Sequence, residues 1–334
     1  MLSVICPIYN EEKYISQCVE SILTQDYPKD DLEILFVDGM SLDKTRDIVR
    51  DYSEKYPFIY LLDNPQKIVP CAMNIGIKAS KGDIIIRLDA HASYEKDYFS
   101  VLSRRLIELD ADNVGLVCKT DVLNKTPKTL AIREVLSNKL GVGNSTFRTG
   151  IDKVIEVDTV PFGCYRRDTF ERFGMYDERL IRNQDFELNY RIRKGNGRIY
   201  IVPDSYCTYF ARDTFKKLWI QNYKNGLWGI RTVLITGNSN SLALRHYIPM
   251  IFVLSLVTPL FASLLCFPLI GIAGLSLLSY LLAIGVVSLF TGIRKQLNIL
   301  YLLLGFATLH LSNGCGMLVS LFTAKLYIKR INAQ

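Results

Sequence analysis

The chain has 334 residues, of which 40 are basic and 33 acidic, and its formal net charge is +7. All acidic residues lie at or before Asp213, whereas the part from Lys216 onward carries basic residues only. Because this basic surplus accompanies apolar sequence and not a polar face, we expect no nucleic-acid partner. The eight cysteines have no CxxC spacing, which predicts neither a disulfide framework nor a zinc site and indicates a reducing compartment.

The first third of the chain alternates apolar runs with amphipathic segments. Strands are predicted at residues 2–8, 32–37, 59–62 and 84–88. Helices are predicted between them, at residues 11–24, from a cap at Ser41 or Asp43 to residue 56, at 70–79 and at 96–109. Strands alternating with helices at this spacing predict an α/β fold, with a mostly parallel sheet and helices on both faces.

The regular pattern fades after a further strand at residues 114–118. Residues 124–158 contain Gly141, Gly143 and Gly150 and are expected to form a loop-rich, substrate-facing segment. Order is predicted to resume at residues 162–172 and 185–194 and in a strand at 198–202. The catalytic domain predicted from all these elements covers residues 1–212.

Residues 213–245 are predicted to form a helical linker. Apolar and aromatic residues follow helical spacing over residues 213–235, with lysines and arginines around them. Such a helix fits the membrane interface, and a helix packed in a protein core fits nearly as well.

The remaining residues, 246–334, are predicted to form a membrane region. Roughly 20 apolar residues cross a bilayer as a helix, and three segments qualify, at residues 248–267, 269–290 and 299–322. With the catalytic domain inside, three spans would place Lys325 and Arg330 outside, against the positive-inside tendency. We therefore predict two full spans and a re-entrant or tilted third segment, in which residues 312–316 could allow a break.

Candidate ligand-binding residues follow the ends of three predicted strands. They are Pro7, Tyr9, Asn10 and Glu11 after the first strand, Asp38, Gly39 and Ser41 after the second, and Asp89 and His91 after the fourth. Because the carboxyl ends of parallel strands meet at one edge of a sheet, these residues are expected to converge there. A carboxylate and an imidazole at that edge can hold a divalent cation, although any single strand end can also be ordinary turn chemistry.

Several of these segments together resemble the family 2 glycosyltransferases, which have the GT-A fold. The resemblance lies in the motifs at residues 7–11 (Pro-Ile-Tyr-Asn-Glu), 37–41 (Val-Asp-Gly-Met-Ser), 88–91 (Leu-Asp-Ala-His), 163–167 (Gly-Cys-Tyr-Arg-Arg) and 183–188 (Asn-Gln-Asp-Phe-Glu-Leu). It covers residues 2–205, and within the family the chain is most similar to the membrane-bound succinoglycan-type exopolysaccharide transferases.

The resemblance implies a role for each matching residue. The nucleotide pocket would be lined by the residues after the first strand, Pro7, Tyr9, Asn10 and Glu11. The base or ribose would be bound by Asp38, with Gly39 and Ser41 beside it. Asp89 would touch the ribose or a metal, and His91 stands where the second Asp of the family's Asp-x-Asp motif usually lies. A nitrogen ligand suits Mn²⁺ better than Mg²⁺, so Mn²⁺ is the expected cation. Asp185 matches the general base, although its position also suits the cap of the helix that follows.

The activity implied is an inverting transfer of a single sugar from a nucleotide sugar, expected to be a UDP-sugar, to a polyprenyl-diphosphate-linked glycan. It would serve exopolysaccharide or cell-surface polysaccharide synthesis. The chain would be a multi-pass protein of the inner (cytoplasmic) membrane, in contact with its lipids, with the catalytic domain facing the cytoplasm.

Two alternative functions remain open. The first is a processive polysaccharide synthase, although the Gln-x-x-Arg-Trp signature of those enzymes is missing from the nearest run, residues 221–225. The second is a catalytically decayed nucleotide-sugar sensor, because His91 and Gln184 depart from the family's pattern. A nicotinamide-dependent oxidoreductase is excluded, since it needs a GxGxxG turn after the first strand and residues 6–12 contain no glycine.

Overall fold

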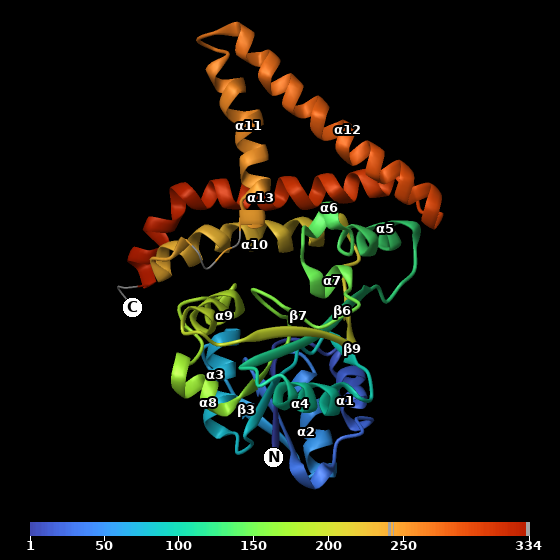
Figure 1. Ribbon diagram of the computed structural model, residues 1–334, viewed down its shortest axis with the longest axis vertical. Coiled ribbons are helices and arrows are strands. Elements are labelled where there is room, and N and C mark those ends of the chain that lie inside the picture. Colours follow the sequence, from blue (N-terminus) through green and yellow to red (C-terminus); the bar gives the residue numbers. More distant parts are fainter. Residues whose placement is uncertain (240–241, 243, 332–334) are drawn as a thin grey trace. The chain divides into compact units, whose positions relative to one another are not determined.

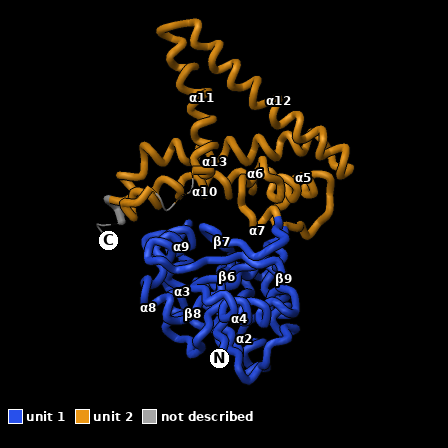
Figure 2. Tube along the Cα trace, viewed as in Figure 1, with its two compact units in different colours: residues 1–119, 150–210 blue, residues 120–149, 211–334 orange. Residues whose placement is uncertain are grey.

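The structure is a computed structural model that describes residues 1–239, 242 and 244–331. The chain forms two compact units (Figure 2). Unit 1 consists of Met1–Lys119 and Gly150–Phe210, and unit 2 of Thr120–Thr149 and Ala211–Gln334. The segment 120–149 therefore packs with the C-terminal region. It interrupts the sequence of unit 1, which resumes at Gly150.

Unit 1 is built on one mixed sheet, which Figure 1 shows with the helices around it. Its strand order is β3-β2-β1-β4-β8-β6-β9-β5, and β7 pairs with β9. The strands are β1 Leu2–Ile8, β2 Leu32–Asp38, β3 Ile59–Asp63, β4 Ile84–Arg87, β5 Ala92–Tyr94, β6 Asn113–Asp121, β7 Ile155–Glu156, β8 Cys164–Arg166 and β9 Ile199–Phe210. The first four strands are mutually parallel, as predicted, whereas β8 runs antiparallel to β4 and β6. The carboxyl ends of the four parallel strands meet at one edge of the sheet, which brings the residues after β1, β2 and β4 together.

Helices cover this sheet, and they are α1 Ile15–Leu23, α2 Thr45–Lys55, α3 Val69–Ala79, α4 Tyr98–Glu108, α8 Arg167–Phe173 and α9 Gln184–Lys194. A short 3₁₀ turn, Lys29–Asp31, precedes β2. The helix α3 lies directly on β1, because a Cβ atom placed on Gly76 would come within 2.5 Å of the Ile5 side chain. Glycine at this position lets the helix approach the sheet closely and bury its apolar face.

The middle segment contains three helices, so the expectation of a loop-rich segment over residues 124–158 is wrong for about half of its length. It contains α5 Pro127–Val135, α6 Lys139–Val142 and α7 Thr146–Thr149. Thr126 and Thr129 form a reciprocal capping box at the start of α5, and Pro127 occupies the first turn, where its missing N–H is no loss. Within unit 2, the buried Glu134 of α5 accepts two hydrogen bonds of 2.8 Å from Lys295.

The other described residues of unit 2 include four long helices, α10 Phe215–Thr236, α11 Ile248–Ala262, α12 Ile270–Lys295 and α13 Ile299–Ile331. A short turn, Leu244–His246, precedes α11, and another, Phe267–Leu269, precedes α12. The helices α10 and α13 pack backbone to backbone: a Cβ atom on Gly226 would lie 2.0 Å from the Asn313 carbonyl oxygen, and one on Gly316 would lie 2.1 Å from that of Tyr223. One face of α10 is therefore packed inside the protein.

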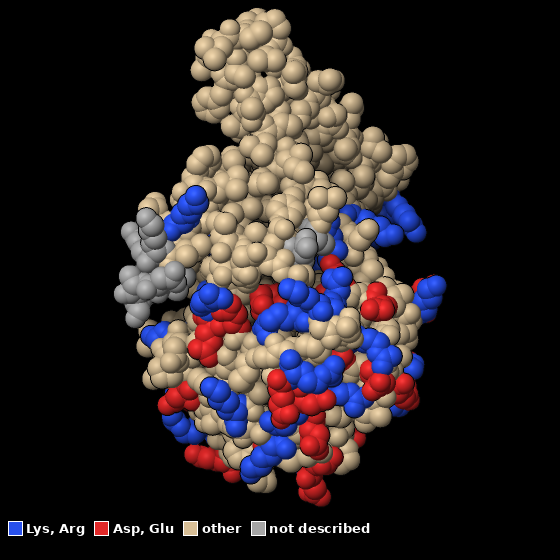
Figure 3. All heavy atoms as spheres, turned by 60° about the vertical axis from the view of Figure 1, so that its left-hand side comes forward, with Lys and Arg blue, Asp and Glu red and all other residues tan. Residues whose placement is uncertain are grey.

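Among the described residues, two stretches are long and apolar enough to cross a membrane, Phe267–Lys295 and Ile299–Ile328. The helix α11 ends at Ala262, short of the predicted 267, and its 15 residues reach about 22 Å, less than the ~30 Å of a hydrocarbon core. The predicted break at residues 312–316 is absent, because α13 is continuous there and the small residues serve its contact with α10. In the face of the molecule that Figure 3 shows, the hairpin of α11 and α12 is almost free of charge.

Candidate active site

The loops that follow β1 and β2 are joined by reciprocal hydrogen bonds. The Asn10 backbone N–H donates to Ser41 Oγ at 2.9 Å, and the Leu42 N–H donates to Asn10 Oδ1 at 2.9 Å. The Glu11 N–H donates to Thr45 Oγ1 at 2.7 Å. These hydrogen bonds hold the two loops together. Asn10 takes a left-handed backbone conformation in the first of them, with φ 54°. Thr45 was not among the predicted site residues, although a hydroxyl at a helix start is a common capping signal.

Asp38 is the last residue of β2, and its side chain has no exposed surface. One carboxylate oxygen accepts from the Ser41 hydroxyl at 2.5 Å, and the other accepts from the Ser41 N–H at 3.0 Å and from Arg46 Nη1 at 2.7 Å. In this conformation Asp38 holds the Ser41 turn and the Arg46 side chain. A nucleotide can meet the carboxylate only after one of these groups moves.

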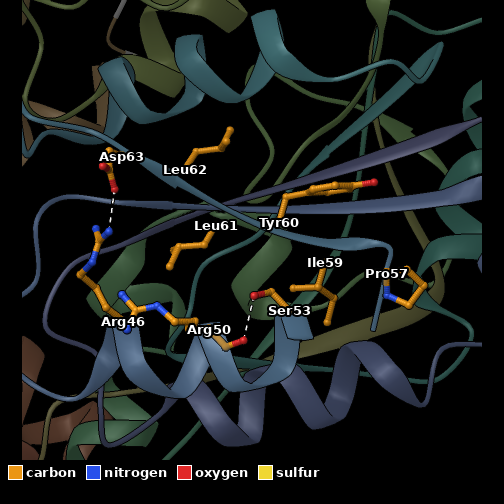
Figure 4. Close-up of a pocket in the computed structure, with 9 residues that line it drawn as sticks. All are labelled: Arg46, Arg50, Ser53, Pro57, Ile59, Tyr60, Leu61, Leu62 and Asp63. Atoms are coloured by element: carbon orange, nitrogen blue, oxygen red, sulfur yellow. Dashed lines mark hydrogen bonds and ion pairs between the residues drawn. The ribbon is translucent and has the colours of Figure 1, made fainter. Parts of the chain in front are cut away.

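Arg46 connects the site to a groove along the edge strand β3. Its second terminal nitrogen donates to Asp63 Oδ1 at 2.8 Å, and Figure 4 shows this contact at one end of the groove. The groove has a volume of about 600 Å³, a size typical of small-molecule pockets. It is lined by α2 and β3 residues such as Arg50 and Tyr60. Of the predicted site residues, none lines it.

The other residues of the first two strand ends lie close by. Pro7 pairs with Val37 in the parallel ladder of β1 and β2. Tyr9 is 43% exposed, and its ring would come within 3.2 Å of a Cβ atom placed on Gly39. Glycine at this position therefore allows the aromatic ring to lie against the backbone, where it is open to a flat ligand.

Asp89 and His91 follow β4. The Asp89 backbone is clamped by Tyr94, whose hydroxyl accepts from the Asp89 N–H at 2.8 Å and donates to its carbonyl at 2.9 Å. His91 Nδ1 lies 3.4 Å from Glu11 Oε1, and its ring meets Tyr209 edge to face at 5.2 Å. The structure thus brings Glu11, Asp89 and His91 together, as the convergence of strand ends predicts.

These residues provide only part of a metal coordination shell. Among the described residues, no group of three or more His, Cys, Asp and Glu side chains is arranged to hold an ion. The side chains of Asp89 and His91 are 23% and 20% exposed, so one oxygen and one nitrogen donor can face a ligand. This donor set fits a cation that arrives with phosphate oxygens and water better than a resident structural metal.

Asp185 lies in the first turn of α9, one residue after its start, and does not cap the helix. The residue before the helix is Asn183, whose backbone has φ 62° and whose side chain makes no capping hydrogen bond. Arg87, the last residue of β4, donates from Nη1 to Asp185 Oδ1 and from Nη2 to Asp89 Oδ1, the latter at 3.2 Å. This guanidinium, which sequence reasoning did not single out, joins the predicted base to the predicted donor-site carboxylate.

The electrostatic environment raises the pKa of Asp185. The largest cause is desolvation of its carboxylate, and the nearby Asp89 charge acts in the same direction. The Arg87 guanidinium opposes both and does not fully offset them. In its ionised form, a carboxylate with a raised pKa is a stronger base than an exposed one.

Three other polar side chains also have structural partners, the two arginines of the motif at residues 163–167 and His310 of α13. Arg166 Nε donates to the Ala111 carbonyl at 3.0 Å, and Arg167 Nε donates to the Gly82 carbonyl at 2.6 Å. In unit 2, His310 Nε2 lies 2.9 Å from the Leu140 carbonyl and Nδ1 lies 3.1 Å from the Tyr280 hydroxyl. Both ring nitrogens of His310 are thus used in packing α13 against its neighbours.

Comparisons with known proteins agree with this architecture. The family model described as Glycosyl transferase family 2 matches residues 3–174. The dolichyl N-acetyl-alpha-D-glucosaminyl phosphate 3-beta-D-2,3-diacetamido-2,3-dideoxy-beta-D-glucuronosyltransferase of Methanococcus voltae is 31% identical, covering 67% of this chain and 71% of that protein. Succinoglycan biosynthesis protein ExoA of Rhizobium meliloti (strain 1021) is 30% identical and 67% of each chain is covered.

One solved structure is similar over nearly the whole chain. The mannosyltransferase PcManGT from Pyrobaculum calidifontis, in complex with GDP-Man and Mn²⁺, superposes with a TM-score of 0.56 at 19% identity, covering 93% of this chain and 86% of that one. This likeness confirms the predicted fold, a GT-A domain followed by a helical C-terminal region. The family match and the two relatives confirm the resemblance read from the motifs, and the chain belongs to glycosyltransferase family 2.

Proposed function

We propose that this glycosyltransferase moves one sugar from a nucleotide-sugar donor to a lipid-linked glycan, with inversion at the anomeric carbon. The observation that carries the proposal is the contact of Arg87 with both Asp89 and Asp185, because it assembles two carboxylates from distant parts of the chain in one site. An inverting transfer needs one group for the donor's leaving part and a carboxylate base for the acceptor.

The proposed reaction is a single displacement. The acceptor hydroxyl oxygen attacks the anomeric carbon while the bond from that carbon to the nucleotide diphosphate breaks. Asp185 takes the hydroxyl proton, and the diphosphate leaves with the bonding electron pair. Attack and departure occur on opposite faces of the sugar ring, so the configuration inverts.

Asp89 and His91 would hold a divalent cation together with diphosphate oxygens. When bound, such a cation supplies positive charge that stabilises the leaving diphosphate. We favour Mn²⁺, because it accepts a nitrogen ligand better than Mg²⁺ does and because the similar solved mannosyltransferase contains it.

The donor and acceptor are proposed by class. A UDP-sugar is the preferred donor because of the resemblance in the first two strand-end motifs, and GDP-sugars belong in the same assay because the solved neighbour holds GDP-Man. A polyprenyl-diphosphate-linked glycan is the preferred acceptor, since the Methanococcus relative is named for a dolichyl-phosphate-linked sugar. The two membrane-length helices found among the described residues of unit 2 would keep the enzyme near an acceptor confined to the bilayer.

We place the protein in the inner (cytoplasmic) membrane as a multi-pass protein, with unit 1 in the cytoplasm. The support is chemical: the six cysteines of unit 1 are buried free thiols, which suits a reducing compartment. A protease added to intact and to permeabilised cells would test this orientation, because unit 1 should be cleaved only after permeabilisation.

The test of the activity is nucleotide release from a panel of UDP-, GDP- and dTDP-sugars by the detergent-purified chain with Mn²⁺. Release from one donor should be lost in Asp185→Asn and His91→Ala. It should be kept in Asp168→Asn, which removes an aspartate charge that is 54% exposed on α8. Unchanged release by Asp185→Asn would contradict the proposal, and binding without release, even with polyprenyl-linked glycans, would point to a sensor.

A further inference from the structure

Arg87 is an unusual residue for its position. It ends β4 after three isoleucines, and its side chain is only 7% exposed. Its backbone is fixed by the sheet, because its N–H donates to the Gly163 carbonyl at 3.0 Å. A charged side chain this deeply buried is costly unless it is paired, so the charge calls for an explanation beyond packing.

The guanidinium is paired with two carboxylates that come from separate elements. Nη1 donates to Oδ1 of Asp185 on α9, and Nη2 donates to Oδ1 of Asp89 beyond β4 at 3.2 Å. The three groups together carry one net negative charge. Without the Arg87 guanidinium between them, the two carboxylates would repel each other and one would tend to take up a proton.

We propose that Arg87 is a positioning residue for the transfer reaction, which orients the Asp185 carboxylate through one terminal nitrogen while holding Asp89 through the other. This inference rests on the proposed function, because it assigns Arg87 a role toward the proposed base. Arg87 keeps its proton at any working pH and therefore takes no part in proton transfer itself.

The two carboxylate oxygens of Asp185 have different surroundings. Oδ1 is occupied by Arg87, and the contacts recorded among the described residues give Oδ2 no hydrogen bond. The orientation set at Oδ1 therefore determines where Oδ2 points to receive the hydroxyl proton. A fixed base matters, since a misplacement of about 1 Å can cost on the order of 10²-fold in rate.

The competing explanation is that Arg87 only stabilises unit 1, through the packing of its buried side chain and its pair with Asp89, and does not act through Asp185. Both explanations predict harm from Arg87→Met, so the loss of activity alone does not separate them. They differ in the background of Asp185→Asn. A residue that acts through Asp185 has little left to do there, whereas a structural role independent of Asp185 lowers the rate by the same factor in both backgrounds.

The experiment measures sugar transfer by the detergent-purified full chain for wild type, Arg87→Met, Asp185→Asn and the double variant. We expect Arg87→Met to lower kcat, measured at saturating donor, by about 10²-fold. In the Asp185→Asn background, Arg87→Met should change the residual rate by less than about threefold. Equal factors in the two backgrounds would overturn the inference.

Two further variants keep the test decisive. Arg87→Lys retains the charge but not the two-pronged geometry, so it should fold and still transfer at least about tenfold more slowly; wild-type kcat in this variant would overturn the inference. Arg105→Met is the matched control, since Arg105 also pairs with an aspartate in unit 1, Asp204, and its kcat should equal that of wild type. A wild-type chain that transfers no sugar would overturn the proposed function as well, whereas an active wild type with an equally active Arg87→Met overturns only this inference.

Discussion

Replacing Arg46 by methionine tests the role of the buried Asp38–Arg46 ion pair at the end of β2. Asp38 has no exposed surface, and Arg46, which is 24% exposed, is its cationic partner at 2.7 Å. Arg46→Met would leave a buried carboxylate with only the two hydrogen bonds from Ser41. The expected consequences are a less stable unit 1 and a loosened Ser41 turn, and therefore weaker nucleotide binding.

The size of the effect follows from the burial of Asp38. Removing one partner of a buried ion pair costs about 3–5 kcal/mol, and the Ser41 contacts that remain reduce our expectation to about 2–4 kcal/mol. In a domain of 150–250 residues, 1 kcal/mol shifts Tm by about 2–4 °C. Unit 1 falls in this range, so Arg46→Met should lower its Tm by about 4–16 °C.

The assay is thermal unfolding of the detergent-purified full chain, followed by tyrosine and tryptophan fluorescence with and without nucleotide. The control is Arg50→Met on the same helix, since Arg50 and Asp47 are both more than half exposed and such a pair contributes about 0–1 kcal/mol. Adding Asp38→Asn to Arg46→Met should recover part of the loss, because the uncompensated charge is removed. A Tm for Arg46→Met within 2 °C of the Arg50→Met control would refute the reasoning.

Four further outcomes follow from the site and from unit 2. Asp185→Asn should lower kcat by about 10²–10⁴-fold while calorimetry shows nucleotide affinity unchanged; a similar loss of both would mean that Asp185 supports the site's structure. Because the pKa of Asp185 is raised above 3.8 and the base acts in its ionised form, kcat should fall on acidification at a higher pH than an ordinary aspartate would give, and a kcat profile flat down to pH 4 would contradict this assignment. His91→Asp should increase activity with Mg²⁺ relative to Mn²⁺, since it replaces a nitrogen donor by an oxygen; an unchanged metal preference in chelator-treated enzyme would count against a ligand role. Gly316→Ala should destabilise unit 2 by about 1–3 kcal/mol, because its Cβ would meet the Tyr223 carbonyl, whereas Gly271→Ala, with open space around it, should leave Tm unchanged.

The parallel half of the sheet was predictable from the sequence, and the antiparallel half was less so. Strand β2 is buried at all seven positions, so it reads as a continuous apolar run. Strand β8 is only three residues long, too short for any periodic pattern. The helix α5 was missed because three glycines after it suggested a loop, although Thr126 and Pro127 gave a recognisable helix start.

The predicted parallel sheet indicated that the site residues would meet, but not how they would pair. The convergence of Glu11, Asp89 and His91 follows from parallel strand topology. The pairing of Arg87 with Asp185 depends on the placement of α9 against β4, across 98 positions of sequence, which no local pattern reports. Similarly, glycines such as Gly316 in an apolar helix can mark either a break or a close helix contact, and only the packing of α10 decides.

The most direct test of the central claim is the mass and anomeric configuration of the lipid-linked product. The detergent-purified chain would be incubated with its donor, Mn²⁺ and a polyprenyl-diphosphate-linked glycan, and the product examined by mass spectrometry and NMR. The account predicts one added sugar with the configuration opposite to that of the donor, and none with Asp185→Asn. A ladder of added sugars would contradict single transfer, and a retained configuration would contradict Asp185 as the base of an inverting reaction.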